Sequence, residues 1–364
     1  MIETGRPSLM RFLLGDSLNR ERIRNILAGQ SIDRVPIFPF LLGFCAHNVG
    51  YPISTIYSDA EKSFKAQLRT LEQYDFDWGP IYGYASYGNW EFGGEVEMPT
   101  GDYQQAPAHK IFPVKSENDV ENIRLPDPVH AGCLPIALEF SQFQKQYNMP
   151  ISVMLGGVFT MAGNICAAET LCRWMLKKPD LVHRILRLAA EHTVQVVRLW
   201  ADKFGAANVI PMIWEPLATN LIISPKQFSR FVLPYLIEVS EQIIGIGVKH
   251  ILYHICGEQN ANLPYWQQVP MGDPGLCSIG EEIALEKAIG MFGEKCIIVG
   301  NIDPKVLLSG PPEKIYEISV AAIEQGKRSP RGYMLCSGCE VSPNTPGYNI
   351  FMMSKAIKDY GAFC

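Results

Sequence analysis

The feature that most constrains the fold of this chain is an alternation of short apolar segments with longer helical patterns. Eight segments are rich in β-branched and aromatic residues and are as short as strands. They cover residues 35–40, 76–82, 151–157, 208–215, 249–256, 275–280, 296–303 and 333–339. Continuously apolar strands that alternate with helices favour a parallel sheet covered on both faces. We therefore predict an α/β fold, a (β/α)8 TIM barrel, with a three-layer open sheet as the competing architecture.

Helical patterns fill the intervals between the predicted strands. They cover residues 59–73, 135–147, 179–204, 225–247, 282–292 and 312–326. The third of them opens with Pro179 and Asp180, which suit a first helical turn. No internal repeat, low-complexity tract or linker interrupts the sequence, so we predict a single domain over residues 1–364. Residues 1–30 are predicted to form a helical extension that covers the barrel, and residues 83–130 a long insertion or lid.

Charge and apolar content exclude several classes of partner. The net charge is −5 and no run of lysine and arginine stands out, so we expect no binding to nucleic acid. The uncharged stretch 146–168 is interrupted by Pro150, Gly156 and Gly163, which favours a strand, a loop and a helix start over a membrane span. The first residues lack the apolar stretch of an export signal. We therefore expect a cytoplasmic protein whose ten cysteines are reduced, and a homo-oligomer is compatible with these totals.

Two residues at the end of the fifth predicted strand point to a metal. His254 and Cys256 are two positions apart in 251-ILYHICG-257. If this segment is a strand, their two side chains lie on the same face of it. The C-terminal ends of barrel strands are where TIM-barrel chemistry takes place, and there the pair could bind one ion. The competing interpretation is that both are core residues, because buried free cysteines are common.

The last predicted strand ends in 335-LCSGCEVSPNTP-346, which offers two more thiols. One of Cys336 and Cys339 would complete a His/Cys/Cys set with an open fourth position, as in catalytic zinc sites. Both together would complete a structural zinc site, and a redox C-x-x-C pair is a third interpretation. Residues three apart face opposite sides of a regular strand, so we favour one ligand, Cys339, which lies closer to the strand end.

Five segments resemble, in order and spacing, the uroporphyrinogen decarboxylase superfamily and in particular its zinc-dependent corrinoid methyltransferases. The segments are 20-RERIRNILAGQSIDRVPIFP-39, 222-IISPKQFSRFVLPYL-236, 254-HICG-257, 298-IVGNIDP-304 and 338-GCEVSPNTPGYNI-350. This branch includes methylcobamide:coenzyme M methyltransferases and the methyltransferases of anaerobic O-demethylase systems. The resemblance implies a (β/α)8 barrel and a zinc motif, H-x-C followed much later by a Gly-Cys pair. His254, Cys256 and Cys339 match that motif, and Cys336 lies outside it.

The same resemblance bears on the reaction. Uroporphyrinogen decarboxylases carry an arginine-rich segment of the form RQAGRY after the first strand, whereas residues 37–50 of this chain contain no arginine. A highly anionic tetrapyrrole needs such cations, so we do not expect decarboxylation. Glu215 and Asn301 stand at strand ends and are candidate catalytic residues; family members often carry an acidic residue at the position of Glu215. The alternatives are a structural hydrogen-bond network for Glu215 and a turn beside the pocket for Asn301 and Asp303.

Aromatic residues and thiolates favour opposite directions of methyl transfer. The segment 82-YGYASYGNWEF-92 predicts an aromatic lid, with Tyr82, Tyr84 and Trp214 as substrate-binding residues for an aromatic methyl ether. A packed insertion is the alternative for this segment. Two thiolates on a zinc ion favour instead a thiol acceptor such as coenzyme M. We predict transfer from a small methoxylated compound to the cobalt of a corrinoid, with the methylcorrinoid:thiol reaction as the alternative.

The corrinoid is expected on a partner protein. The chain lacks the D-x-H-x-x-G signature of a cobalamin-binding domain, so a separate corrinoid protein would have to dock over the barrel mouth. A non-catalytic accessory protein that binds zinc or a corrinoid on the same barrel is the remaining alternative.

Overall fold

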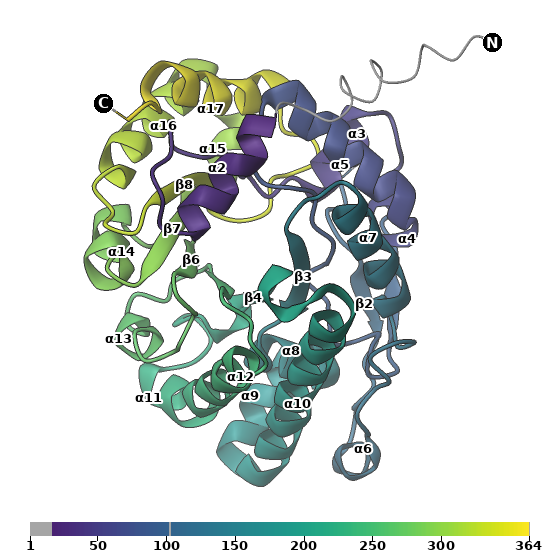
Figure 1. The fold of residues 1–364 in the computed structure, drawn as a ribbon. Coiled ribbons are helices and arrows are strands. Elements are labelled where there is room, and N and C mark those ends of the chain that lie inside the picture. The colour runs from purple at the N-terminus through teal and green to yellow at the C-terminus, as the bar shows by residue number, and fades with distance from the viewer. Residues whose placement is uncertain (1–16, 102, 364) are drawn as a thin grey trace, which may run out of the picture.

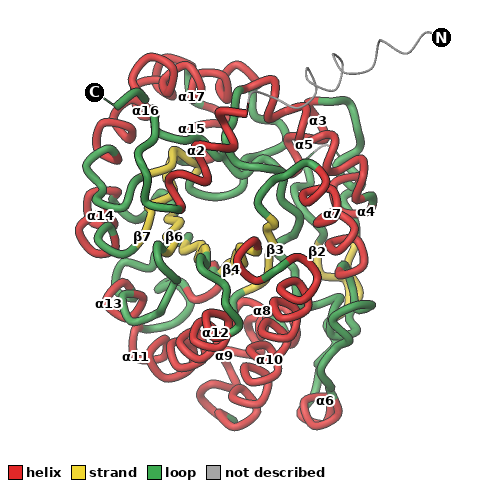
Figure 2. Tube along the Cα trace, in the orientation of Figure 1, coloured by secondary structure: helices red, strands yellow, loops and turns green. Residues whose placement is uncertain are grey.

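The computed structural model describes residues 17–101 and 103–363, and its strands form the inner ring of a barrel (Figures 1 and 2). Six strands pair in chain order, and every pair is parallel. They are β3 (Ile151–Gly156), β4 (Val209–Trp214), β5 (Leu252–Ile255), β6 (Gly275–Ile279), β7 (Cys296–Ile302) and β8 (Tyr333–Ser337). Figure 2 shows the helices on the outside of this ring. The predicted TIM-barrel-like α/β fold is confirmed.

The two remaining segments of the ring, 35–40 and 76–82, are extended but do not form the regular strands that we predicted. Ile37 makes a single parallel bridge to Leu335 of β8, and the backbone N–H of Asp77 donates to the carbonyl oxygen of Ile37 at 3.0 Å. Three prolines in these segments have no N–H to donate to a ladder, which explains the short pairing. They are Pro36, Pro39 and Pro80.

Helices cover the outer face of the barrel. They are α2 (Ser17–Leu27), α3 (Leu42–Asn48), α4 (Thr55–Ser58), α5 (Ala60–Tyr74), α6 (Glu117–Asn122), α7 (Leu134–Gln146), α8 (Val158–Cys166), α9 (Ala168–Lys177), α10 (Pro179–Phe204), α11 (Pro225–Gln227), α12 (Leu233–Gly245), α13 (Leu263–Trp266), α14 (Leu285–Phe292), α15 (Pro304–Ser309), α16 (Pro312–Gly326) and α17 (Gly347–Tyr360). As predicted, α10 begins at Pro179; it ends before Gly205, whose φ of 86° closes the helix. Among the described helices, none is both long and apolar enough to cross a membrane.

Two predicted helices differ from the observed ones for local reasons. The pattern 225–247 is divided by a π-helical turn over Phe228–Val232, where the N–H of Leu233 donates to the carbonyl oxygen of Phe228. The next residue, Pro234, lacks the N–H that a continuous helix would use. The helix expected from residue 282 begins at Leu285, because the preceding residues form a loop.

The predicted insertion and extension have the following structure. Residues 83–130 contain consecutive turns, the antiparallel pair β1 (Glu95–Glu97) and β2 (Ala108–Ile111), and α6. Of the predicted extension 1–30, residues 1–16 lie outside the described residues, and α2 follows them. Arg22 of α2 is buried and forms ion pairs with Asp33 and Asp77, which tie the helix to the barrel. The division into one domain with an extension and a lid stays a prediction.

Candidate metal centre

His254 lies in β5 between Trp214 of β4 and Ser278 of β6, its neighbours in the parallel ladder. The ring is fully buried, and its Nδ1 lies 2.8 Å from Ser278 Oγ. The other ring nitrogen, Nε2, is buried and has no hydrogen-bond partner among the described residues. A buried polar nitrogen without a partner is costly. Because neutral imidazole is the commonest metal ligand among side chains, Nε2 is a candidate metal-binding atom.

Two thiols complete a compact set of donor atoms with His254. Cys256 follows β5 and Cys339 follows β8, and their sulfur atoms lie 4.0 Å apart. The ligand atoms of His254, Cys256 and Cys339 all lie within 4.8 Å of one another. In a tetrahedral site with Zn–S bonds of about 2.3 Å, two sulfur atoms stand roughly 3.8 Å apart. The donor types and the sulfur separation therefore fit a zinc ion.

The electrostatics of the thiol pair favour one thiolate. Contact between the two sulfur atoms lowers the pKa of Cys339 and raises the pKa of Cys256, because one thiol can donate a hydrogen bond to the other as thiolate. The neighbouring His254 also lowers the pKa of Cys339. A thiolate is the form of cysteine that binds a metal.

The chain turns sharply after Cys256, and two features hold the turn. Gly257 has a φ of 74°, a backbone conformation that side chains other than glycine rarely adopt. Gln259 is fully buried and its amide nitrogen donates to the carbonyl oxygens of Cys256 and Glu215, at 3.1 and 3.0 Å. Sequence reasoning missed both Gln259, which lies two residues beyond 251–257, and Ser278, which lies in the neighbouring strand β6.

Cys336 is separate from this set. It lies within β8 and is fully buried, and burial raises the pKa of its thiol. Of the two cysteines in 335-LCSGCEVSPNTP-346, only Cys339 belongs to the group of donor atoms found among the described residues. The arrangement therefore has two thiols and one imidazole, which is the open set and not the four-ligand set.

Glu215 accepts hydrogen bonds from the first turn of α8. Its buried carboxylate accepts hydrogen bonds from the backbone N–H groups of Phe159 and Thr160, at 2.9 and 2.7 Å, and from the Thr160 hydroxyl. Burial raises the pKa of Glu215 to about 7, and these hydrogen bonds oppose the rise. These contacts match the hydrogen-bond network that was the alternative to a catalytic role. The catalytic role stays a prediction.

Asn301 and Asp303 shape the rim of the barrel. The Asn301 amide nitrogen donates to the carbonyl oxygens of Gly280 and Ile283, at 3.2 and 2.8 Å, and so holds the loop before α14. Asp303 accepts from the backbone N–H of Lys305 at 2.7 Å and caps α15. Both residues thus have turn-forming contacts, and a catalytic role for Asn301 stays a prediction.

The three predicted substrate-binding aromatics lie in different surroundings. Tyr82 and Tyr84 are buried, and their hydroxyl groups donate to the carbonyl oxygen of Tyr57 at 2.8 Å and to Glu91 at 2.7 Å. Trp214 lies beside His254, with ring centroids 4.3 Å apart, and its buried indole N–H has no partner among the described residues. Of the three, Trp214 is adjacent to the donor atoms and has an unused hydrogen-bond donor.

The segment 82–92 packs against α10, and this packing makes a prediction about pH. The hydroxyl oxygen of Tyr87 lies 2.9 Å from Nε2 of His192. The imidazole of His192 is fully buried, and burial lowers its pKa from 6.5 to about 3. As the pH falls below about 6.5, His192 therefore becomes protonated in the unfolded chain but stays neutral in the folded chain. We expect the protein to lose about 2 kcal/mol of stability at pH 5 through this residue.

Urea unfolding of the native sequence and of His192→Gln at pH 7.5 and pH 5 measures this effect. The native sequence should lose more stability than the variant on acidification, because the variant has no imidazole at this position. Equal losses in the native sequence and in His192→Gln would contradict the packed arrangement of this segment.

Two acidic residues that sequence reasoning did not single out lie close to the thiols. A side chain added at Gly280 would meet Glu282 Oε2 at 2.7 Å and Cys256 Cβ at 3.2 Å, so Glu282 and Cys256 flank the same point. Glu340 follows Cys339 and accepts from the Tyr57 hydroxyl at 3.5 Å. Burial and the charge of Cys339 raise the pKa of Glu340 to about 8. Two carboxyl groups whose pKa values are raised therefore lie beside the donor set.

Comparison with known proteins identifies the family. The family model described as uroporphyrinogen decarboxylase (URO-D) matches residues 18–360. The chain belongs to the uroporphyrinogen decarboxylase family. A uroporphyrinogen decarboxylase of Coxiella burnetii is 24% identical over 265 residues, which cover 68% of each chain. Membership of this family alone does not define the reaction, because other relatives have different names.

Other relatives are methyltransferases. A methylcobamide:CoM methyltransferase of Methanosarcina barkeri is 27% identical over 281 residues, which cover 74% of this chain and 76% of the relative. A second methylcobamide:CoM methyltransferase, from Methanosarcina mazei, is 23% identical over 352 residues, or 94% of this chain and 98% of that one. The solved structure of a methyltransferase from Methanosarcina mazei aligns with a TM-score of 0.80 and 23% identity, over 94% of this chain and 98% of that chain. This structural likeness supports the barrel fold.

Proposed function

We propose that this chain is a zinc-dependent methyltransferase that moves a methyl group between a small molecule and the cobalt of a corrinoid carried by a partner protein. The observation that carries the proposal is the compact donor set of His254, Cys256 and Cys339, in which an imidazole nitrogen has no hydrogen-bond partner among the described residues. Three protein ligands are typical of catalytic zinc sites, whereas structural sites use four. The relatives named as methylcobamide:CoM methyltransferases support the same reaction class.

The residues around the donor set have distinct tasks in this proposal. His254, Cys256 and Cys339 would hold the zinc ion, which when bound supplies Lewis acidity toward a thiol or an ether oxygen. Ser278 fixes the orientation of the imidazole through Nδ1, so that Nε2 stays available. Trp214 forms an apolar wall beside His254, and its indole N–H, which has no partner in the described part of the chain, can donate a hydrogen bond to a bound substrate. The reacting groups are thus oriented by side chains on rigid strands.

A thiol acceptor is the substrate class that we place first. The relatives include a methylated-thiol–coenzyme M methyltransferase of Methanosarcina mazei, 28% identical over 66% of this chain and 62% of that one. Two cysteine ligands also neutralise the charge of a divalent ion, which favours a nucleophilic thiolate over strong polarisation of an ether. The argument for a methoxylated aromatic donor is reduced, because Tyr82 and Tyr84 are buried with their hydroxyl groups engaged.

Methyl transfer from a methoxylated aromatic compound to the corrinoid is the second candidate, and Trp214 favours it. Its ring can stack on an aromatic substrate, and its N–H can donate to an ether oxygen. This direction needs a corrinoid in the Co(I) state as the methyl acceptor. The thiol direction needs a methylated corrinoid as the donor.

The two directions are separated by one spectroscopic assay of the zinc-loaded protein. Free cobalamin replaces the partner protein, and the absorbance of methylcobalamin is followed. We expect its loss when a thiol such as coenzyme M is added, whereas its formation from Co(I) cobalamin and a methoxybenzoate would support the second candidate. Zinc near one per chain without transfer in either direction would overturn both and favour an accessory binding protein.

A further inference from the structure

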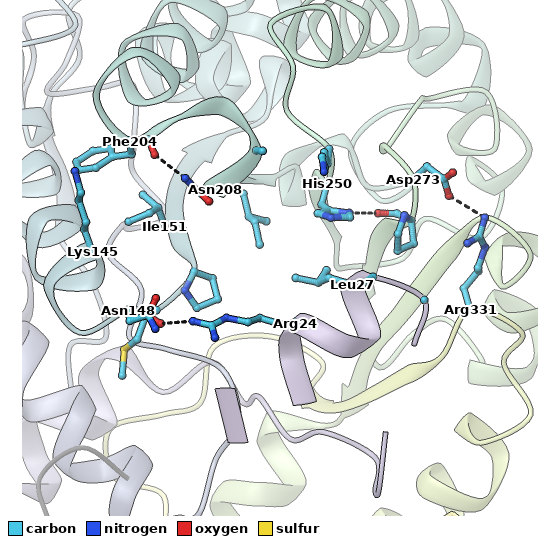
Figure 3. A pocket seen from close by; sticks show the side chains of 18 residues that line it. Arg24, Leu27, Lys145, Asn148, Ile151, Phe204, Asn208, His250, Asp273 and Arg331 are labelled. Carbon is cyan, nitrogen blue, oxygen red and sulfur yellow. Dashed lines mark hydrogen bonds and ion pairs between the residues drawn. The ribbon is translucent and has the colours of Figure 1, made fainter. Parts of the chain in front are cut away.

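A cavity of about 610 Å³ opens at the end of the barrel opposite the donor set (Figure 3). Its lining includes the early strand residues Ile151 and Ile210, and it also includes His250 and Arg331, which precede β5 and β8. All these strands are parallel, so the cavity lies at their amino ends, whereas the thiols lie at their carboxyl ends. His250 and Cys256 are roughly 20 Å apart for an extended chain that rises about 3.3 Å per residue.

The rim of this cavity is positively charged. Among the described residues that line it are four basic side chains and one carboxylate, Asp273. The cations are Arg24, Lys145, Lys249 and Arg331. Arg331 pairs with Asp273 at 2.8 Å, which neutralises the carboxylate. This excess of positive charge stands out in a chain whose net charge is −5.

Among the residues that the structure describes, two of the four cations form no ion pair and no side-chain hydrogen bond. Lys145 lies in the last turn of α7, where a basic side chain also offsets the partial negative charge of the helix end. Arg24 and Arg331 have partners, since they donate to the carbonyl oxygens of Asn148 and Glu294 at 3.3 Å each. Within the described ranges, neither Lys145 nor Lys249 forms an ion pair or a side-chain hydrogen bond. Their charges remain available to a ligand.

Apolar residues form the inner part of the cavity. Leu27, Ile151 and Ile210 line it, and the two isoleucines are buried. Figure 3 shows Leu27, Lys145 and His250, which come from distant parts of the sequence, around one opening. The Nδ1 of His250 donates to the carbonyl oxygen of Pro274 at 2.9 Å, which leaves Nε2 as a polar atom of the wall. An apolar base with a few polar groups and a basic rim is typical of sites for organic anions.

We propose that this cavity is a second binding site, which takes a small organic anion with two negative charges. Lys145 and Lys249 hold the anionic groups, and the carbon skeleton packs on Leu27 and Ile210. The site is independent of the metal centre and of the proposed methyl transfer. Because the cavity also contacts α2 through Leu27, a bound anion would tie α2 to the barrel.

Isothermal titration of the full chain with isophthalate and with phenyl phosphate tests this site. The two probes distinguish a dicarboxylate from a phosphate ester, and benzoate at matched ionic strength controls for a single charge. We expect at least one dianion to bind with a dissociation constant below about 1 mM. Binding no stronger than that of benzoate would overturn the proposal.

Charge-matched variants locate the binding. Lys145→Gln combined with Lys249→Gln should weaken binding at least tenfold, whereas Lys226→Gln combined with Lys358→Gln, at exposed positions elsewhere, should not change it. Cys256→Ser should bind the dianion as the native sequence does. The proposal would be contradicted if the Lys145→Gln, Lys249→Gln double variant bound the dianion as tightly as the native sequence, or if Cys256→Ser lost binding.

Discussion

Replacing Cys256 with serine is expected to lower the zinc content well below one ion per chain and to reduce the rate of methyl transfer more than roughly a hundredfold. The serine hydroxyl stays protonated and is a poor zinc ligand, so only His254 and Cys339 would remain. Replacing a residue that only orients a metal ligand already lowers metal affinity or activity about 10- to 100-fold. Metal analysis after dialysis and the methylcobalamin assay measure the two effects.

Cys336→Ser is the matched control for this prediction. It replaces a buried thiol three residues before Cys339, and the Cys336 sulfur does not belong to the donor set. Zinc content should stay near that of the native chain. Ser278→Ala should give an intermediate result, because His254 loses the contact at Nδ1 but keeps Nε2. Full zinc retention in Cys256→Ser, or its loss in Cys336→Ser, would refute the assignment of ligands.

Replacing Arg22 with methionine is expected to lower the free energy of unfolding by about 3–5 kcal/mol. The guanidinium group binds Asp33 through two nitrogens, at 2.6 and 2.7 Å, and also contacts Asp77. The side chain of Asp77 is fully buried and also accepts from Arg34 and from the backbone N–H of Ile37. Methionine keeps the apolar stem but leaves part of this buried negative charge uncompensated. Urea unfolding measures the loss.

An exposed ion pair provides the control for Arg22. Lys65 and Glu61, one turn apart on α5, pair at 2.5 Å at the surface, and Lys65→Met should cost no more than about 0.5 kcal/mol. A second check combines Arg22→Met with Asp77→Asn. Removing both charges should cost clearly less than the two single changes added together, because the residues are in contact. A loss below about 1 kcal/mol in Arg22→Met would show that this network does not anchor α2.

The barrel could be predicted from the sequence because its central strands are continuously apolar and its helices have clear starts. The predicted segment 151–157 became β3, and the helix that opens at Pro179 became α10. Predictions failed where one residue has a local effect that a periodic pattern does not record. Pro234 interrupts the pattern 225–247, and the amide of Asn301 holds a loop where a helix start was expected.

The candidate site could be predicted only in part. The spacing of His254 and Cys256 places both in the group, and Cys339 comes from the end of another strand. The partner of His254 could not be predicted, because Ser278 depends on the register between two strands. The burial of Tyr82 also depends on tertiary packing, since a run of aromatic residues looks the same in a lid as in a core.

The barrel is closed by few backbone hydrogen bonds at residues 35–40 and 76–82, and we call this part of the wall the seam. From β3 to β8 every strand is paired by a ladder, whereas residues 35–40 and 76–82 join through isolated backbone bonds. Amide hydrogens at such a seam are expected to exchange with solvent sooner than those of the ladder, through local openings that need less free energy than global unfolding. Such an opening would separate the stacked rings of Phe38 and Trp78, whose centroids lie 5.0 Å apart. The fluorescence of Trp78 would then report motion of the barrel wall while the strands that carry the thiols stay paired.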